Sequence, residues 1–148
     1  MLRVDPKINT ITLVLITLIV GSLASSNTGT DTWYQGLIKS SLNPPGYVFG
    51  IVWPILYLLM GITAWRNIDT IKIYFYIQLF LNAIWSWLFF SFQLPLVALF
   101  DIWLLIFINI KILFIVFKQD KIGAILYAPY ILWLLFASYL NVFIVLNN

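Results

Sequence analysis

The stretch IYFYIQLFLNAIWSWLFFSFQLPLVALF, residues 73–100, runs for 28 positions without a charged side chain. A helix needs about 20 consecutive apolar residues to cross the hydrocarbon core of a bilayer. The run is continuous, whereas the strands of a membrane β-barrel are short segments of alternating polarity. It therefore predicts a membrane-spanning helix, which we place over residues 73–93.

Three other uncharged runs are long enough to span a membrane: 23 residues between Lys7 and Asp31, 26 between Lys39 and Arg66, and 27 after Lys121. They predict helices over about 8–24, 46–65 and 122–146. The apolar stretch 96–117 predicts a further helix, with Asp101 in the first turn and Lys111 extending toward the opposite membrane surface. We therefore expect one all-α domain over 1–148, a bundle of five transmembrane helices with its longest loop at 25–45.

The composition excludes most other classes of protein. Apolar residues make up 63% of the 148 positions and charged residues only 9%, with a mean hydropathy of +1.01, whereas a soluble domain is about 45–50% apolar and about 25% charged. A soluble enzyme, a disordered chain and a nucleic-acid-binding protein are thereby excluded. The chain also lacks His, Cys and Glu, so we expect no metal site and no required cofactor.

The positive charges are distributed unequally between the two ends of the predicted bundle. Six Lys or Arg residues fall on the side that holds the N-terminus and the loops at 66–72 and 118–121, against Lys39 alone on the other side. By the positive-inside rule we expect a cytoplasmic N-terminus in a bacterial cell membrane. As an alternative, the first span could be a signal peptide that is cleaved near Ser22-Leu23-Ala24.

Three tryptophans fall at nearly the same depth in three different spans, far from the membrane surface where Trp usually lies. They are Trp53, Trp85 and Trp133. A buried indole N–H needs an acceptor, so this arrangement indicates either an aromatic core or a shared cavity, and the tryptophans alone do not separate the two.

Polar and small side chains share helix faces with these tryptophans. Gln78, Asn82 and Trp85 follow the i, i+4, i+7 spacing, and amides inside a membrane face the bundle or a cavity. Trp53 shares a face with Tyr57, as Trp133 does with Ala137 and Asn141. An aromatic pocket with a few amides suits a flat hydrophobic ligand.

The loop at 25–45 is polar at its start and ends in Asn43-Pro44-Pro45. It is either a cap over the mouth of the bundle or a simple connector. We expect Asn43 to cap the second helix, with both prolines in the first helical turn, where a missing N–H costs nothing.

The chain is similar to one known family in three ordered motifs. They are Trp33-Tyr34-Gln35-Gly36-Leu37-Ile38-Lys39 followed by Asn43-Pro44-Pro45-Gly46-Tyr47-Val48-Phe49-Gly50-Ile51-Val52-Trp53, then Gln78-Leu79 with Asn82 and Trp85, and finally Pro129-Tyr130, Trp133, Phe136-Ala137 and Leu140-Asn141. These motifs closely resemble the TspO/MBR family, which includes the tryptophan-rich sensory proteins of bacteria and the mitochondrial translocator protein, also called the peripheral benzodiazepine receptor.

The resemblance implies a five-helix bundle, commonly a homodimer, with a pocket beneath the loop between the first two helices. Members of the TspO/MBR family bind porphyrins and haem-type tetrapyrroles, isoquinoline and benzodiazepine drugs and, in animals, cholesterol. The ligand-binding residues expected here are Trp33, Tyr34, Asn43, Tyr47, Trp53, Tyr57, Gln78, Asn82, Trp85, Phe89, Trp133, Ala137 and Asn141.

Three functions are compatible with these residues. The chain is expected to be a sensor or carrier of tetrapyrroles or of similar small hydrophobic ligands. The alternatives are an enzyme that degrades porphyrin by photo-oxidation through Trp53 and Trp133, and a transporter in which Asp101 carries a proton. Because His and Cys are absent, we expect a porphyrin to be held by shape and by stacking on Trp53 and Trp133, not by an axial ligand. Its acid groups would be met by Lys39 or by backbone N–H groups of the 25–45 loop.

Overall fold

The computed structural model describes residues 4–148, which are helical over most of their length. The helices are α1 (Pro6–Ser25), the short α2 (Thr32–Gly36), α3 (Gly46–Ser86), the π-helical turn η1 (Trp87–Ser91), α4 (Pro95–Gln119) and α5 (Lys121–Asn147). Arg3, which contributes to the charge asymmetry, lies outside the described residues.

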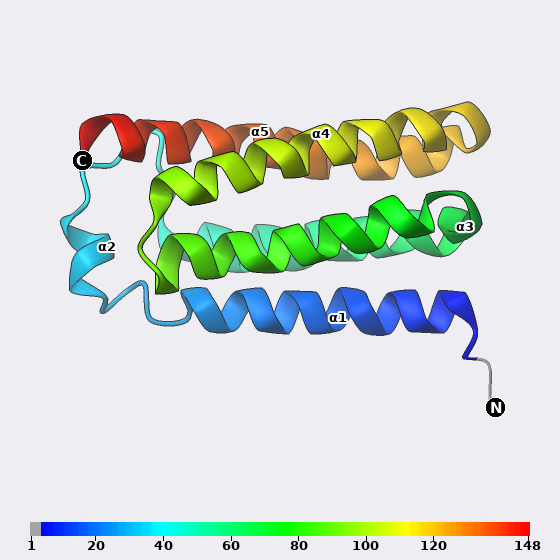
Figure 1. The fold of residues 1–148 in the computed structure, drawn as a ribbon, viewed down its shortest axis with the longest axis horizontal. Helices are drawn as coiled ribbons and strands as arrows, with labels where there is room; N and C mark the ends of the chain where they lie inside the picture. Colours follow the sequence, from blue (N-terminus) through cyan, green and yellow to red (C-terminus); the bar gives the residue numbers. More distant parts are fainter. Residues whose placement is uncertain (1–3) are drawn as a thin grey trace.

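Helix α3 is a hairpin of two antiparallel legs (Figure 1). The Tyr57 hydroxyl donates a hydrogen bond of 2.7 Å to Asn82 Oδ1, and the Gln78 amide lies 3.3 Å from the Met60 sulfur. In a straight helix, residues 25 positions apart would be separated by about 37 Å, so the chain must reverse between the members of these pairs. The reversal is centred at about Asp69.

The prediction of a loop at 66–72 is therefore wrong in one respect, because these residues stay helical through the reversal. The segment Arg66-Asn67-Ile68-Asp69-Thr70-Ile71-Lys72 contains neither Gly nor Pro, the residues that most often end a helix. Its backbone hydrogen bonds thus continue, and the change of direction takes place within a bent helix.

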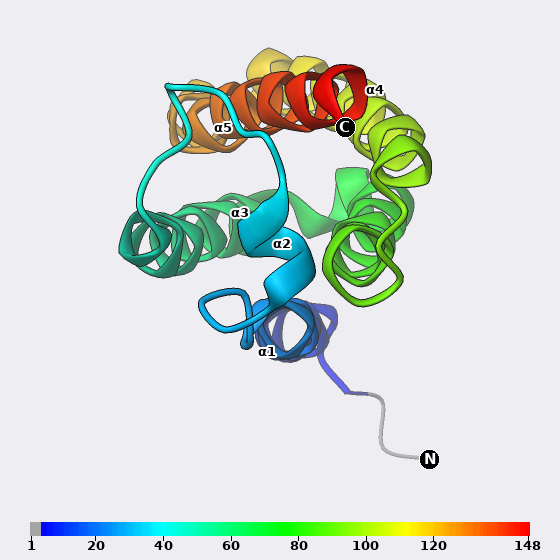
Figure 2. The ribbon, with the colours of Figure 1, turned by 90° about the vertical axis from the view of Figure 1, so that its left-hand side faces the viewer.

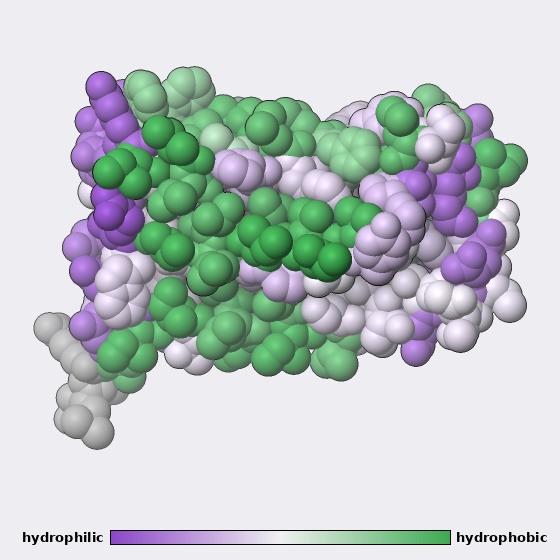
Figure 3. All heavy atoms as spheres, turned by 180° about the vertical axis from the view of Figure 1, so that it is seen from behind, coloured by the Kyte–Doolittle hydropathy of each residue, from purple (hydrophilic) through white to green (hydrophobic). Residues whose placement is uncertain are grey.

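The five-span membrane bundle is confirmed. Four helical segments are long and apolar enough to cross a membrane, and the segment Gly46–Ser91 supplies two crossings because it folds back on itself. α1 packs on the hairpin of α3, and α4 and α5 pack on its opposite side, giving three layers (Figures 1 and 2). An apolar band covers the middle of the molecule between two more polar ends (Figure 3).

The start of α3 differs from the prediction. The helix begins at Gly46, with Pro45 as its N-cap residue, and the Asn43 side chain donates instead to the Pro44 carbonyl, at 3.3 Å. A residue that precedes a proline is disfavoured in helical conformation. Pro44 precedes Pro45 and is therefore disfavoured in the helix. Pro45 is the N-cap residue, so both prolines lie before the first helical residue, Gly46. Asn43 is then too far from the first helical turn to act as its cap.

A polar cluster fixes the α3 reversal to the junction between α4 and α5. Asp120 accepts hydrogen bonds from Arg66 Nε and Nη2 at 2.7 and 2.9 Å, from Asn67 Nδ2 at 2.9 Å and from the Gly123 N–H at 3.0 Å. The Arg66 guanidinium, helped by the Gly123 N–H and the Asn67 amide, holds the pKa of Asp120 well below its usual range. Asp120 is thus an anionic anchor shared by three helices.

Asp101 lies deeper than expected. Helix α4 begins at Pro95, and no acidic residue lies in its first turn, so Asp101 belongs to the second turn. Its Oδ2 atom is buried without a hydrogen-bond partner among the described residues. The expected position in the first turn was wrong because even a helix that began at residue 96, as predicted, would place Asp101 beyond a first turn of 3.6 residues.

Candidate functional site

A cavity of about 550 Å³ lies at the end of the bundle that α2 covers. α1, the 26–45 segment, both legs of α3, η1 and α5 all contribute to its wall. Figure 2 views this end, with α2 lying across it in front of the long helices. The volume falls in the range of small-molecule sites, roughly 300–1,000 Å³.

All three deep tryptophans line the cavity. The rings of Trp53 and Trp133 meet nearly edge to face, with centroids 6.2 Å apart at an interplanar angle of 87°. Trp85 stacks on Phe89, with centroids 5.4 Å apart. The alternatives of aromatic core and shared cavity therefore resolve into a cavity whose wall is aromatic.

The indole N–H groups of this wall differ in their partners. Trp85 Nε1 donates to Asn141 Oδ1 at 3.2 Å, and Asn141 in turn donates to the Pro95 carbonyl at 2.8 Å. Trp133 Nε1 is buried and has no acceptor among the residues that the structure describes. A buried donor without an acceptor is costly, and because this nitrogen is covered by protein atoms, Trp133 meets the cavity with its ring and not with its N–H.

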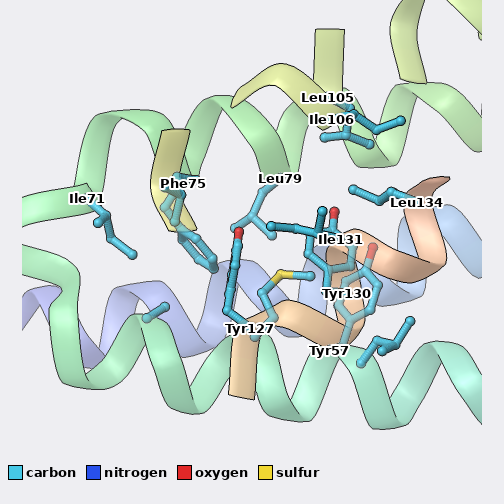
Figure 4. Close-up of a cluster of buried hydrophobic side chains, with 14 of the residues drawn as sticks. Tyr57, Ile71, Phe75, Leu79, Leu105, Ile106, Tyr127, Tyr130, Ile131 and Leu134 are labelled. Atoms are coloured by element: carbon cyan, nitrogen blue, oxygen red, sulfur yellow. The ribbon is translucent and has the colours of Figure 1, made fainter. Parts of the chain in front are cut away.

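A network of buried tyrosines and amides forms the floor. Tyr57 donates to Asn82 Oδ1, Asn82 Nδ2 donates to the Tyr130 hydroxyl at 2.5 Å, and Tyr130 donates to Gln78 Oε1 at 2.8 Å. Figure 4 shows Tyr57 and Tyr130 among the apolar side chains of this core. Tyr57 and Asn82 line the cavity, whereas Gln78, fully buried, does not.

The 26–45 segment forms the cap of the cavity, which decides between the two expectations for this loop. Thr28, Gly29, Gln35, Asn43 and Lys39 from this segment line the cavity. Two contacts with α5 hold the cap in place. Asn148 accepts from the Ile38 N–H at 2.8 Å and donates to the Ile38 carbonyl at 3.1 Å, and the Ser40 and Tyr139 hydroxyls are 2.8 Å apart.

Lys39 is the one charged residue in the cavity wall, as far as the described residues extend. Its Nζ lies 4.6 Å from the centre of the Tyr34 ring and within 3.4 Å of the Gln35 and Leu37 carbonyls. Burial raises the pKa of the Tyr34 hydroxyl, while a hydrogen bond with Asn43 opposes this to a smaller extent. Tyr34 therefore stays neutral beside a cationic group.

Ten of the thirteen predicted site residues line this cavity: Tyr34, Asn43, Trp53, Tyr57, Asn82, Trp85, Phe89, Trp133, Ala137 and Asn141. Three lie outside the lining. Trp33 packs behind the wall against Phe89, with ring centroids 6.0 Å apart, and Gln78 lies in the polar network below the floor. Tyr47 lies in the first turn of α3 and is 70% exposed.

Several lining residues were not predicted from the sequence. α1 contributes Leu18, Gly21, Ser22 and Ser25, whose small or apolar side chains give no signal of a binding site. Gly50 and Pro54 line the cavity together, and because Pro54 has no N–H, the Gly50 carbonyl lacks its usual helical donor. That acceptor could have been inferred from the position of Pro54.

Comparison with known proteins agrees with this geometry. The model of the TspO/MBR family matches residues 10–146. The tryptophan-rich protein TspO of Archaeoglobus fulgidus is 39% identical over 144 residues, which cover 91% of this chain and 94% of the relative. The human translocator protein is 32% identical over 119 residues, covering 74% of this chain and 70% of the relative.

Proposed function

The chain belongs to the TspO/MBR family, and from this membership and the cavity we propose that it is a membrane sensor or carrier that binds porphyrins. Flat hydrophobic drugs of the isoquinoline and benzodiazepine type belong to the same ligand class. The protein is a multi-pass integral membrane protein, so its ligand is one that dissolves in, or crosses, the lipid phase.

The observation that carries the proposal is the pair of tryptophans in the cavity wall. Trp53 and Trp133 offer two ring surfaces at nearly a right angle. Aromatic rings contribute about 0.5–1.5 kcal/mol per pair beyond the area that they bury. A flat aromatic ligand would pack against both rings.

The polar groups of the cavity support a ligand with acid groups at one edge. Lys39 is the charged group that lines the cavity in the described part of the chain, and it lies in the cap. A porphyrin that carried its propionates toward the cap would pair them with this ammonium. The chain supplies neither His nor Cys, so the iron of a haem would gain no strong axial ligand.

The test is a titration of the purified protein with protoporphyrin, followed by quenching of tryptophan fluorescence. We expect Trp53→Phe to weaken binding by about two- to tenfold, which corresponds to the loss of one aromatic pair. The matched control is Trp103→Phe, because Trp103 donates to Ser138 at 2.9 Å and does not line the cavity. Equal affinity of wild type and Trp53→Phe would contradict the proposal, as would a large preference for iron porphyrin over the metal-free form.

Porphyrin degradation is a second candidate because the contact between Trp53 and Trp133 places two oxidisable rings together. Replacing both by Phe would then abolish light-dependent loss of the porphyrin absorbance while binding persists. If binding and turnover fall together, the two rings serve binding alone. Transport coupled to Asp101 has less support, since Asp101 is not among the residues that line the cavity.

A further inference from the structure

A second hollow lies on the lipid-facing side of the bundle, between α1 and the first leg of α3. This lateral groove has a volume of about 330 Å³, and only apolar and aromatic residues and Gly61 line it. α1 contributes Ile11, Val14, Leu15 and Leu18, and α3 contributes Pro54, Tyr57, Leu58, Gly61, Ile62 and Trp65. The one hydroxyl among them, that of Tyr57, donates to Asn82.

The lateral groove and the cavity share a wall. Leu18, Pro54 and Tyr57 line both hollows. Leu18 is the one shared residue from α1, and Pro54 and Tyr57 lie nearly one helical turn apart on α3. A shift of the Leu18 side chain would therefore connect the bilayer with the binding cavity.

The seam between α1 and the first leg of α3 is held by apolar contacts, except at one end, where Lys7 Nζ lies 5.5 Å from the centre of the Trp65 ring. Asn9 and Thr10 bond to Tyr76 on the second leg, and Trp87 Nε1 of η1 donates to the Val20 carbonyl at 3.1 Å. Within the described residues, no hydrogen bond joins α1 to residues 46–66. The polar contacts of α1 thus lie on one side of it, and the opposite side can part without losing a hydrogen bond.

The cap side of the cavity is fastened differently. Asn148 makes two hydrogen bonds with the Ile38 backbone, and Ser40 bonds to Tyr139. Opening the cap would break these hydrogen bonds. Opening the seam near Leu18 loses dispersion and apolar contacts, which lipid tails can replace, while the contact of Lys7 with Trp65 lies at the far end of the groove.

We propose that the hydrophobic ligand enters the cavity from the bilayer, through the lateral groove and past Leu18, while the cap stays closed. This inference rests on the proposed function, because it concerns the route to the same cavity. A flat hydrophobic molecule is concentrated in the lipid phase, so the groove meets it where it is most abundant. The route makes the seam, and not the cap, the part of the molecule that governs association.

The absence of cysteine allows a direct test with paired cysteines. A Cβ atom added at Gly61 would lie 3.9 Å from Val14 Cγ1, and the sulfur of a cysteine at position 14 would occupy a γ position of the same kind, facing position 61 across the seam. Val14→Cys with Gly61→Cys would therefore lock the seam when oxidised and release it when reduced. The control pair, Ile38→Cys with Asn148→Cys, ties the cap to α5.

The measurement is the rate of tryptophan quenching after protein in lipid nanodiscs is mixed with vesicles that contain protoporphyrin. Oxidation of the seam pair should slow association about tenfold or more with little change in equilibrium affinity, and reduction should restore the rate; about tenfold corresponds to 1.4 kcal/mol of added barrier. The oxidised cap pair should associate within about twofold of its reduced form. Leu18→Ala, which enlarges the opening in the shared wall, should accelerate association.

Two different failures can be distinguished. If the reduced variants and the wild type show no saturable quenching, the proposed function is wrong and the route falls with it. If they bind normally but the seam lock leaves the rate unchanged, or if the cap lock is the one that slows it, then the cavity binds porphyrin and the lateral route is wrong.

Discussion

At the scale of single residues, the tryptophans of the cavity wall differ in their hydrogen bonds. The Trp133 indole N–H is buried without an acceptor, whereas Trp85 in the same wall has Asn141 as its partner. Because the Trp133 nitrogen is covered by protein atoms, a ligand in the cavity would meet its ring and not its N–H. The sign that the wall serves a ligand is therefore the set of three indole rings around one hollow, and not an unpaired donor.

Tyr57 couples the cavity wall to the network beneath it, which leads to a prediction. Tyr57→Phe removes the donor to Asn82 Oδ1 and leaves a buried acceptor unpaired, so it should lower the free energy of unfolding by about 1–3 kcal/mol. The matched control is Tyr47→Phe, because Tyr47 is 70% exposed and its change should be nearly neutral. Thermal unfolding in detergent checks both variants, and equal melting temperatures would show that the network contributes nothing.

At the scale of elements, the position of α5 against the α3 reversal depends on a glycine. A Cβ atom added at Gly123 would lie 2.5 Å from Asp120 Oδ2 and 3.0 Å from Asn67 Nδ2. The Asp120 carboxylate cannot move aside freely, because Arg66, Asn67 and the Gly123 N–H all donate to it. The close approach of the two helices therefore requires a residue without a side chain.

Gly123→Ala should accordingly destabilise the protein by about 1–3 kcal/mol, the usual cost of overpacking, although alanine is the better helix former. Gly36→Ala is the control, since a Cβ atom there would meet nothing within 4 Å. Gly123→Ala should lower the unfolding midpoint clearly more than Gly36→Ala does. A Gly123→Ala protein as stable as the wild type would mean that the Asp120 cluster is not a constraint.

The elements also show how far the sequence alone could lead. Four of the five spans follow from uncharged runs, because charge is too costly inside lipid to leave the pattern ambiguous, and the span at 96–117 follows from an apolar stretch that includes Asp101 and Lys111. The helical reversal did not follow, since polar residues at 66–72 suggest a loop although no helix breaker is present. Most of the cavity was predictable because indoles and amides are unusual at that depth, whereas the α1 wall of Gly21 and Ser22 carries no such signal.

At the scale of the whole molecule, the two ends differ in charge and in structure. Arg66 and Lys121 lie near the end with the α3 reversal, and Lys39 lies in the cap at the other end. By the positive-inside rule we propose that the reversal lies in the cytoplasm and the cap on the outer side. The cavity would accordingly lie in the outer half of the membrane.

A labelling experiment checks this orientation. A single cysteine in place of Ser41, in the cap, should react with a membrane-impermeant maleimide in intact cells. A single cysteine in place of Lys121 should react only after the membrane is opened. The reverse pattern would show that the chain inserts with the opposite orientation and that the cavity is covered from the cytoplasm.

The continuous helical reversal of α3 has a consequence for membranes of different thickness. A bilayer that is thicker or thinner than the hydrophobic length of a span makes helices tilt or shift. The two legs of α3 have no slack between them, so neither can slide along the membrane normal without the other. Trp53 on one leg and Trp85 on the other should thus keep their relative height, so that this part of the cavity wall is held together when a change in lipid composition would displace separately tethered helices.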